Sequence, residues 1–371
     1  MATHCTTLEV ETLAEFDALL AQGATSMRHW RFQAVDLSDR GEELSRLGAH
    51  GSLFLGCDLD EEVADLLRRR GALVFPRLPD VPFDHYRAAL YTPTELYDGV
   101  GQGYSGTLDA RVYAWTTGRL ELTDTLAQAL HDHAVDDALE EFTEGRRLVG
   151  VMGGHALERG SAAYLDAGRL GRALARSGLV VATGGGPGAM EAANLGAYLS
   201  AYDDPVLDEA VQMLAAHPTY HPAVGDWAMA ALGVLERWPE GVDSLGIPTW
   251  HYGHEPPNPM ATRIAKYFKN AIREDILLHL CAAGIVFLPG RAGTVQEIFQ
   301  DACENYYATP ELVAPMVLVG TRHWTETVPA WPLLSSLAAS SSFGSAITLV
   351  DDVASAATFL SARRDLRPTR Q

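Results

Sequence analysis

Two glycine-rich turns carry the residues of this sequence that are best suited to bind an anion. The first is TGGGPGAMEAANLGA (residues 183–197), and the second, about a hundred residues later, is PGRAGTVQE (residues 289–297). Each turn follows an apolar segment typical of a strand and opens a segment typical of a helix. Glycines let backbone N–H groups approach an anion, and the N-terminus of a helix adds a partial positive charge. We therefore expect the two turns to hold one phosphorylated ligand between them.

The second turn also carries a carboxylate, Glu297, one helical turn after Gly293. A phosphate-binding turn with an acid beside it is suited to a hydrolase that acts on a nucleotide. Thr294 and Glu297 also form T-x-x-E, the pattern of a capping box whose two side chains only start the helix. The Pro-Gly dipeptide and Gly293 favour a phosphate cradle instead, with Glu297 directed towards the same ligand.

A third segment, NPMATRIAKYFKNAIREDILL (residues 258–278), is predicted to form one helix with an apolar stripe. Its neighbouring face, at steps of three and four residues, carries Arg263, Lys266, Asn270 and Arg273. Such a basic stripe is commonly a solvated helix face. This one leads directly into the strand before the second turn, so we expect at least one of its arginines to meet the ligand.

The net charge of the sequence limits the kinds of molecule that the protein is expected to bind. The 371 residues include 28 Lys and Arg and 48 Asp and Glu, which gives a formal net charge of −20. We expect no nucleic-acid partner, because DNA and RNA binding neutralises phosphates with Lys and Arg. A small anion can still bind where backbone amides and a few arginines face it.

The sequence does not indicate a metal site, a disulfide framework or a membrane protein. The four cysteines lack C-x-x-C spacing, and the histidine pairs in residues 217–221 and 251–255 lack a third ligand, so no metal is expected. No apolar stretch reaches the length of a transmembrane helix, and the N-terminus lacks a signal-peptide pattern. We therefore expect a cytoplasmic protein without a membrane partner.

The order of elements predicts the fold class. Near-continuous apolar strands alternate with helices over residues 146–371, which favours a parallel sheet covered on both faces. We predict a Rossmann-like, doubly wound α/β domain there, with a helical insertion near 203–240. Ligands bind such sheets at the carboxyl ends of the strands, where both glycine turns fall. Residues 1–145 are predicted to form a smaller α/β region of unknown role, including a β-α-β unit over residues 51–76.

The motif pair GGGxxGxME and PGxxGTxxE resembles the LOG family of nucleoside 5′-monophosphate phosphoribohydrolases, often labelled lysine decarboxylase-like, over roughly residues 148–350. The resemblance implies hydrolysis of the N-glycosidic bond of a nucleoside 5′-monophosphate to free base and ribose 5-phosphate. It also implies a homodimer or higher homo-oligomer with the site near the subunit interface. A decarboxylase would need a lysine bound to pyridoxal phosphate, and no lysine has such a setting, so no cofactor is expected.

By position, the resemblance implies roles for individual residues. Glu297 matches the catalytic glutamate, and Arg273 best matches the catalytic arginine, with Arg263 as the alternative. Arg291 replaces a family glycine and is itself a candidate phosphate contact, and Gly154 and Asn270 are further candidates. The remaining residues implied to bind phosphate and ribose are Gly184, Gly185, Gly186, Gly188, Met190, Glu191, Gly290, Gly293 and Thr294.

Two other functions are compatible with the fold. A non-catalytic nucleotide-binding or carrier protein could keep the turns without chemistry, and the glycine-to-arginine change at residue 291 would fit it. A nicotinamide oxidoreductase would need an acidic residue for the ribose at a place where this sequence has none. Retention of Glu297 and Arg273 favours hydrolysis. The base is not identified, although residues 203–240 and 251–255 are predicted to line its end of the site.

Overall fold

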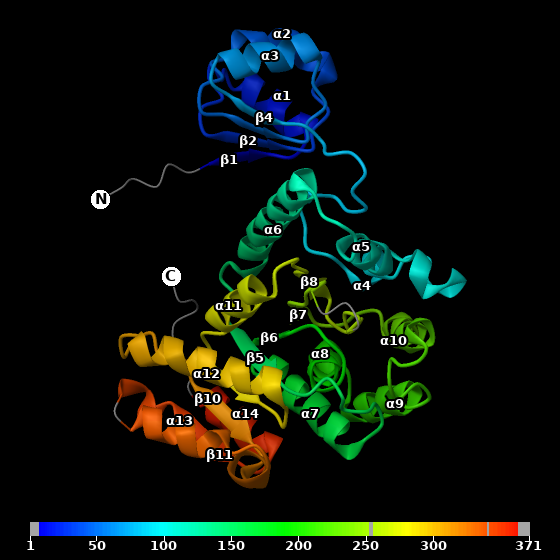
Figure 1. The fold of residues 1–371 in the computed structure, drawn as a ribbon, viewed down its shortest axis with the longest axis vertical. Coiled ribbons are helices and arrows are strands. Elements are labelled where there is room, and N and C mark those ends of the chain that lie inside the picture. The colour runs from blue at the N-terminus through cyan, green and yellow to red at the C-terminus, as the bar shows by residue number, and fades with distance from the viewer. Residues whose placement is uncertain (1–6, 252–254, 340, 363–371) are drawn as a thin grey trace. The chain divides into compact units, whose positions relative to one another are not determined.

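The computed structural model describes residues 7–251, 255–339 and 341–362. The chain divides into two compact units, which are described separately (Figure 1). The smaller unit comprises the residues up to 89 together with residues 119–138. The larger unit comprises residues 90–118 and the chain from residue 139 onward, so no single position separates the two units. Among the described helices, none is long and apolar enough to cross a membrane.

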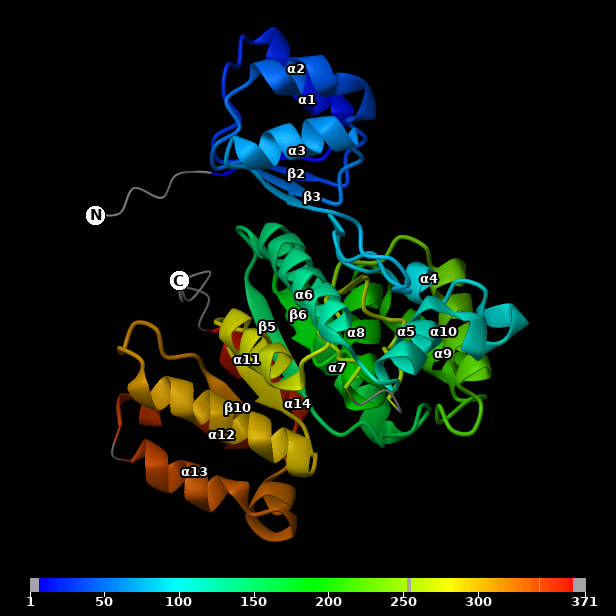
Figure 2. The same cartoon turned by 45° about the horizontal axis from the view of Figure 1, so that its top comes forward.

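The smaller unit is built on a four-stranded parallel sheet in the sequential order β1-β2-β3-β4. Its strands are β1 (Leu8–Val10), β2 (Trp30–Gln33), β3 (Leu53–Leu55) and β4 (Leu73–Phe75). The connecting helices are α1 (Leu13–Ala21), α2 (Gly41–Arg46) and α3 (Glu61–Arg69), which lie on the same face of the sheet in Figure 1 and Figure 2. The β-α-β unit predicted over residues 51–76 is confirmed by β3, α3 and β4.

Alternating side chains of β2 explain how both faces of this sheet are used. Phe32 packs edge-to-face against Phe16 of α1, with ring centroids 5.6 Å apart. Arg31, which points to the opposite face because successive strand residues alternate, forms an ion pair with Asp137. Asp137 belongs to α6 (Leu122–Thr143). The helical face is therefore apolar, and the other face carries charged contacts.

The larger unit contains a seven-stranded, all-parallel sheet in the order β11-β10-β9-β5-β6-β7-β8. The strands are β5 (Leu148–Met152), β6 (Val180–Thr183), β7 (Leu245–Gly246), β8 (Arg263–Ile264), β9 (Ile285–Phe287), β10 (Met316–Val319) and β11 (Ile347–Val350). The chain first adds β6, β7 and β8 on one side of β5 and then adds β9, β10 and β11 on the other. The strand order thus reverses between β5 and β9, and the predicted Rossmann-like, doubly wound fold is confirmed.

The larger unit also contains ten helices among its described residues. They are α4 (Pro93–Leu96), α5 (Leu108–Thr116), α7 (Ala162–Arg176), α8 (Ala189–Tyr198), α9 (Asp204–Leu214), α10 (Val224–Arg237), α11 (Asn270–Leu280), α12 (Ala292–Tyr307), α13 (Ala330–Ala338) and α14 (Val353–Ser361). α7, α8 and α14 share one apolar core cluster with β5 and β6. α9 and α10 occupy the segment 203–240, so that segment is mostly helical.

The helix predicted over residues 258–278 is wrong in its first half. The chain there forms the edge strand β8 (Arg263–Ile264), and α11 begins only at Asn270. β8 pairs with β7 and also exchanges two backbone hydrogen bonds, of 2.9 and 3.0 Å, with Tyr91. Because tertiary contacts routinely override propensity, these long-range bonds outweigh the helical spacing. Of the predicted basic stripe, Asn270 and Arg273 alone lie on α11.

A buried ion pair holds residues 90–118 in the larger unit, although these residues were predicted to belong to the N-terminal region. Lys266, which was predicted on a basic helix face, is buried and bonds to Asp109. Asp109 also accepts hydrogen bonds from Trp250 Nε1 (2.9 Å) and from the hydroxyl of Tyr104 (2.8 Å). These partners satisfy both buried charges, and Lys266 is therefore a structural residue.

Glycines set the distance between α7 and α8. A Cβ atom on Gly196 of α8 would lie 1.7 Å from the carbonyl oxygen of Gly168, and a Cβ atom on Gly171 of α7 would lie 2.0 Å from that of Ala193. The two helices therefore contact each other backbone to backbone. This contact fixes α8, whose N-terminus follows the first glycine turn.

Substituting Gly196→Ala is expected to lower the free energy of unfolding by about 3 kcal/mol, because the added methyl group can be accommodated only by moving backbone atoms. Gly233→Ala in α10 is the matched control, since a Cβ atom there meets nothing within 4 Å. The control should be neutral or stabilising by about 0.5–1 kcal/mol. Urea unfolding of both variants measures the difference, and equal stabilities would contradict the packing described here.

Candidate functional site

Three turns meet at the carboxyl edge of the larger sheet, because β6, β5 and β9 are adjacent strands. They are the turn after β5, which contains Gly154, and the two predicted glycine turns. The amide of Gly154 donates to the carbonyl of Pro289 (3.3 Å) in the second turn. Its own carbonyl accepts from the amide of Ala189 (3.1 Å), which opens the helix after the first turn. Gly154 thus joins both predicted turns through backbone contacts.

Packing explains most of the glycines in the first turn. Gly185 and Gly188 have positive φ angles of 71° and 73°. A Cβ atom on Gly185 would lie 2.5 Å from a side-chain carbon of Pro248, and one on Gly188 would lie 2.5 Å from the carbonyl oxygen of Gly154. Gly184 and Gly186 are buried under Met190, whose sulfur and methyl group would lie 3.0 and 2.8 Å from Cβ atoms there. The first turn is therefore a packed wall of the site.

The second turn has a different character. Gly290 lies under Thr294, because a Cβ atom there would be 2.1 Å from the threonine hydroxyl oxygen. A Cβ atom on Gly293 would meet nothing within 4 Å, and Arg291 and Gly293 are both exposed. α12 begins after Arg291, and no side chain caps its N-terminus. The start of this 16-residue helix is therefore exposed and uncapped, and a helix N-terminus of this kind favours an anion.

The capping-box interpretation of Thr294 and Glu297 is wrong. Thr294 lies inside the first turn of α12 and not at its N-cap, which is Arg291. The carboxylate of Glu297 therefore does not cap the N-terminus of the helix.

Two residues outside the predicted set hold the turns in place. The backbone amide and side-chain amide of Asn258 donate to the carbonyls of Gly185 (2.8 Å) and Gly186 (3.0 Å). His323, in a π-helical turn after β10, has Nε2 2.9 Å from the carbonyl oxygen of Gly290. Asn-Pro at residue 258 is a loop signal that could have identified Asn258. Sequence spacing holds no signal for His323, which follows a different strand.

Arg273 and Glu297, the two predicted catalytic residues, come together between the turns. Arg273 of α11 is 8% exposed, and Glu297 of α12 is 9% exposed. Nη1 of Arg273 lies 4.0 Å from Oε1 of Glu297. The same nitrogen would lie 3.1 Å from a Cβ atom on Gly184, so the guanidinium group also contacts the first turn. One arginine thus connects the first turn with the acid that follows the second.

The environment of Glu297 suits proton transfer. Burial raises the pKa of Glu297 from its ordinary 4.5 to about 7. Arg273 lowers this pKa, whereas the negative charges of Glu274 and Glu255 raise it. A carboxyl group whose pKa lies near neutral pH can both accept and donate a proton there, as an acid–base catalyst must.

Two further acids lie at this site: Glu274, which was not predicted, and Glu255, which ends the segment 251–255 predicted to line the base end. Glu274, next to Arg273 on α11, is 5% exposed and accepts from the side-chain amides of Asn270 (2.8 Å) and Gln296. Glu255 pairs with His155 from the turn after β5, with Oε1 3.2 Å from Nδ1. A Cβ atom on Gly186 would lie 3.6 Å from Glu255. Residues 252–254, which belong to the segment predicted to line the base end, lie outside the described residues.

Two predicted site residues lie elsewhere. Glu191 of α8 is 0% exposed and forms a bidentate ion pair with Arg159, whose guanidinium group also covers the ring of Trp227. A fully enclosed carboxylate with this partner is engaged in the core and does not face a solvent-borne ligand. Arg263 is exposed on the edge strand β8, which is three strands from β5 in the sheet order.

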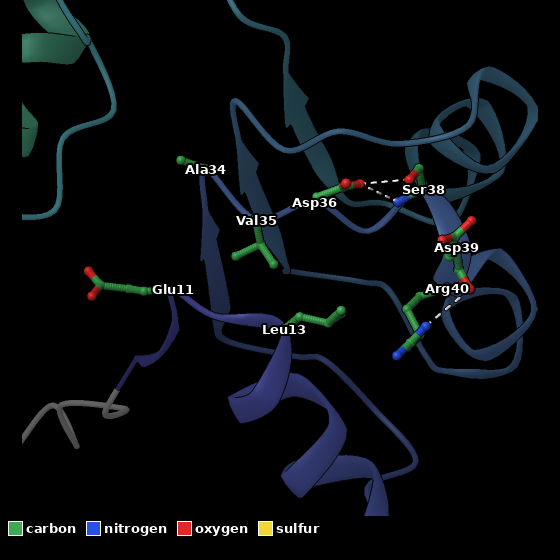
Figure 3. A pocket seen from close by; sticks show the side chains of 8 residues that line it. All are labelled: Glu11, Leu13, Ala34, Val35, Asp36, Ser38, Asp39 and Arg40. Atoms are coloured by element: carbon green, nitrogen blue, oxygen red, sulfur yellow. Dashed lines mark hydrogen bonds between the residues drawn. The ribbon is translucent and has the colours of Figure 1, made fainter.

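Two pockets are lined by other residues. One, in the smaller unit, has a volume of about 210 Å³ and lies where β1 and β2 end (Figure 3). Asp36 there accepts from the amide and hydroxyl of Ser38 (3.1 and 2.6 Å), and Arg40 pairs with Asp17. The other, in the larger unit, has about 500 Å³ and lies beside Arg111. Neither includes a residue of the two glycine turns. Within the described ranges, no group of three or more His, Cys, Asp or Glu could hold a metal ion.

Comparisons with known proteins found a family model and solved structures that are similar to parts of this chain. The model of the SLOG cluster4 family, from a superfamily that includes LOG-like proteins, matches residues 146–201. The chain is similar to the molybdenum cofactor carrier protein of Chlamydomonas reinhardtii, at 19% identity and a TM-score of 0.35, over 58% of this chain and 97% of that one. It is also similar to the molybdenum cofactor binding protein of Rippkaea orientalis, at 16% identity and a TM-score of 0.37, over 58% and 96% of the two chains. No curated protein matches the sequence.

The raised pKa of Glu297 makes the stability of the protein depend on pH. Between pH 4.5 and about 7 the native state holds a proton that the unfolded state releases, so the free energy of unfolding falls as pH rises. At about 1.4 kcal/mol per pH unit, this interval of about 2.5 units corresponds to a loss of up to about 3 kcal/mol. Glu297→Gln lacks this titration and should be more stable than the parent at pH 8. Parallel stability curves for parent and variant between pH 4 and 8 would contradict the assignment.

Proposed function

We propose that the protein hydrolyses the N-glycosidic bond of a nucleoside 5′-monophosphate and releases the free base and ribose 5-phosphate. The observation that carries this proposal is the position of the Arg273–Glu297 pair between two glycine turns. Glu297 is 9% exposed with a pKa near 7, and its arginine partner also contacts Gly184 of the first turn. The resemblance to the LOG family, which rests on these same motifs, supports the reaction type.

The phosphate is proposed to bind at the N-terminus of α12. This helix end is exposed and uncapped, and Gly293 leaves space for an oxygen to approach the backbone. The exposed side chain of Arg291 adds a positive charge at the N-cap position. Binding energy from this remote group would then fix the ribose for reaction at its C1′ atom.

Glu297 is proposed to act on the water and the sugar. Breaking a ribosyl C–N bond passes through an oxocarbenium-like state, with positive charge on the sugar and the electron pair of the bond on the leaving base. An ionised Glu297 would stabilise that positive charge and accept a proton from the attacking water. The positive charge of Arg273, 4.0 Å away, would favour the ionised form of this carboxylate.

The homo-oligomeric state and the cytoplasmic location belong to the same proposal. The oligomer is implied by the resemblance alone, and the location by the sequence alone. A non-catalytic nucleotide carrier is the second candidate, because Arg291 occupies the place of a glycine in the family motif.

Incubation with a panel of nucleoside 5′-monophosphates, followed by chromatographic detection of free base, tests the proposal. The parent protein should release base from at least one nucleotide. Glu297→Gln should reduce the rate about a few hundredfold, because one preorganised electrostatic group is lost, and should leave nucleotide binding intact. Asp275→Asn, an exposed carboxylate on α11, is the control and should keep the parent rate.

A Glu297→Gln variant as fast as the parent would exclude the proposed role of this residue. Binding of a nucleotide without release of base by the parent would favour the carrier.

Gly293 offers a separate test of the phosphate position. Gly293→Asp should fold normally, because its Cβ atom meets nothing and an acid in the first turn of a helix is stabilising. Its negative charge should weaken binding of a nucleoside 5′-monophosphate by about tenfold or more, equivalent to about 1.4 kcal/mol. Gly293→Ala adds a methyl group without a charge, so it is the control for the charge and should weaken binding less than Gly293→Asp does. Isothermal titration calorimetry measures both variants, and equal affinities would place the phosphate elsewhere.

A further inference from the structure

Helices α11 and α12 direct two buried carboxylates towards a single arginine. Glu274 is 5% exposed and Glu297 is 9% exposed, and Arg273 lies within 4.0 Å of both. One positive charge therefore faces two acids in a region with little water. The distances from the guanidinium group of Arg273 to the two carboxylates decide which acid forms the ion pair.

The hydrogen bonds favour pairing of Arg273 with Glu274. Nη2 of Arg273 lies 3.4 Å from Oε1 of Glu274 and donates to Oδ1 of Asn270 at 3.0 Å. The side-chain amides of Asn270, at 2.8 Å, and of Gln296 also donate to Glu274. Donors from two helices thus converge on this carboxylate. In contrast, the 4.0 Å from Arg273 to Glu297 exceeds the length of a hydrogen bond.

We infer that Glu274 is a positioning residue. It holds the guanidinium group of Arg273 beside α11 and thereby leaves the carboxyl group of Glu297 available for proton transfer. The inference deepens the proposed function, and its catalytic meaning rests on that function. If Arg273 instead closed onto Glu297, the acid would be ionised permanently and would be a weaker base.

The other charges around Glu297 come from several elements. Arg273 and Glu274 belong to α11, and Glu255 acts on Glu297 while paired with His155. On the side of the π-helical turn, His323 binds the carbonyl of Gly290 in the second turn. Glu274 raises the pKa of Glu297 by its own negative charge, and it also contacts the one arginine that lowers this pKa. Removing its charge should therefore act twice in the same direction.

A carbon-13 NMR titration of the full-length protein, labelled at the side-chain carboxyl groups of glutamate, tests the inference without any substrate. The signal of Glu297 is assigned by its loss in Glu297→Gln. Glu274→Gln keeps the size of the side chain and should lower the pKa of Glu297 from about 7 to below about 6. Asp275→Asn, the adjacent exposed residue of α11, is the matched control and should leave this pKa unchanged.

Asn270→Ala provides a second variant at the partly exposed start of α11. It removes the amide that binds both Arg273 and Glu274, and it should lower the pKa of Glu297 in the same direction by a smaller amount. An unchanged or raised pKa of Glu297 in folded Glu274→Gln would overturn the inference. A lowered pKa in a protein that cleaves no nucleotide would retain the role of Glu274 and reject the proposed function.

Discussion

Three backbone turns contact one another without intervening side chains at the carboxyl edge of the larger sheet, and the candidate site depends on this contact. Gly188 lies so close to Gly154 that a Cβ atom would be 2.5 Å from the carbonyl oxygen. The amide of Gly154 in turn binds Pro289 of the second turn. Any side chain at these glycines would separate the turns and move the helices that follow them. The close packing of α7 against α8 serves the same constraint, because it fixes the helix after the first turn.

The two turns then divide their roles. The first is buried and packed, and Asn258 holds its carbonyls, whereas the second is exposed and continues into an uncapped helix. Between them lies an acid whose burial raises its pKa to about 7. Such an acid lowers the stability of the protein at neutral pH, since its ionised form is poorly solvated. A cost of this kind is common where function requires a perturbed group.

The sequence was informative where a motif stays local. Apolar strands followed by glycines predicted the doubly wound sheet, and the motifs identified Glu297 and Arg273, which the structure brings together. Long-range contacts escaped prediction. The residues before Asn270 have helical spacing but form an edge strand, because they pair with distant parts of the chain. Glu191 forms an ion pair with Arg159, which lies 32 positions away. Glu274 was not predicted, because its role depends on a hydrogen bond from Gln296, which lies on another helix.

The proposed reaction requires phosphate to bind at the N-terminus of α12 while Glu297 faces the C1′ atom of the sugar. A crystal structure of Glu297→Gln with a bound nucleoside 5′-monophosphate would reveal both positions. We expect phosphate oxygens within hydrogen-bond distance of the first amides of α12, and a ribose whose C1′ atom faces residue 297. Phosphate bound away from both glycine turns, or a ribose with its C1′ atom directed away from residue 297, would contradict the proposed reaction.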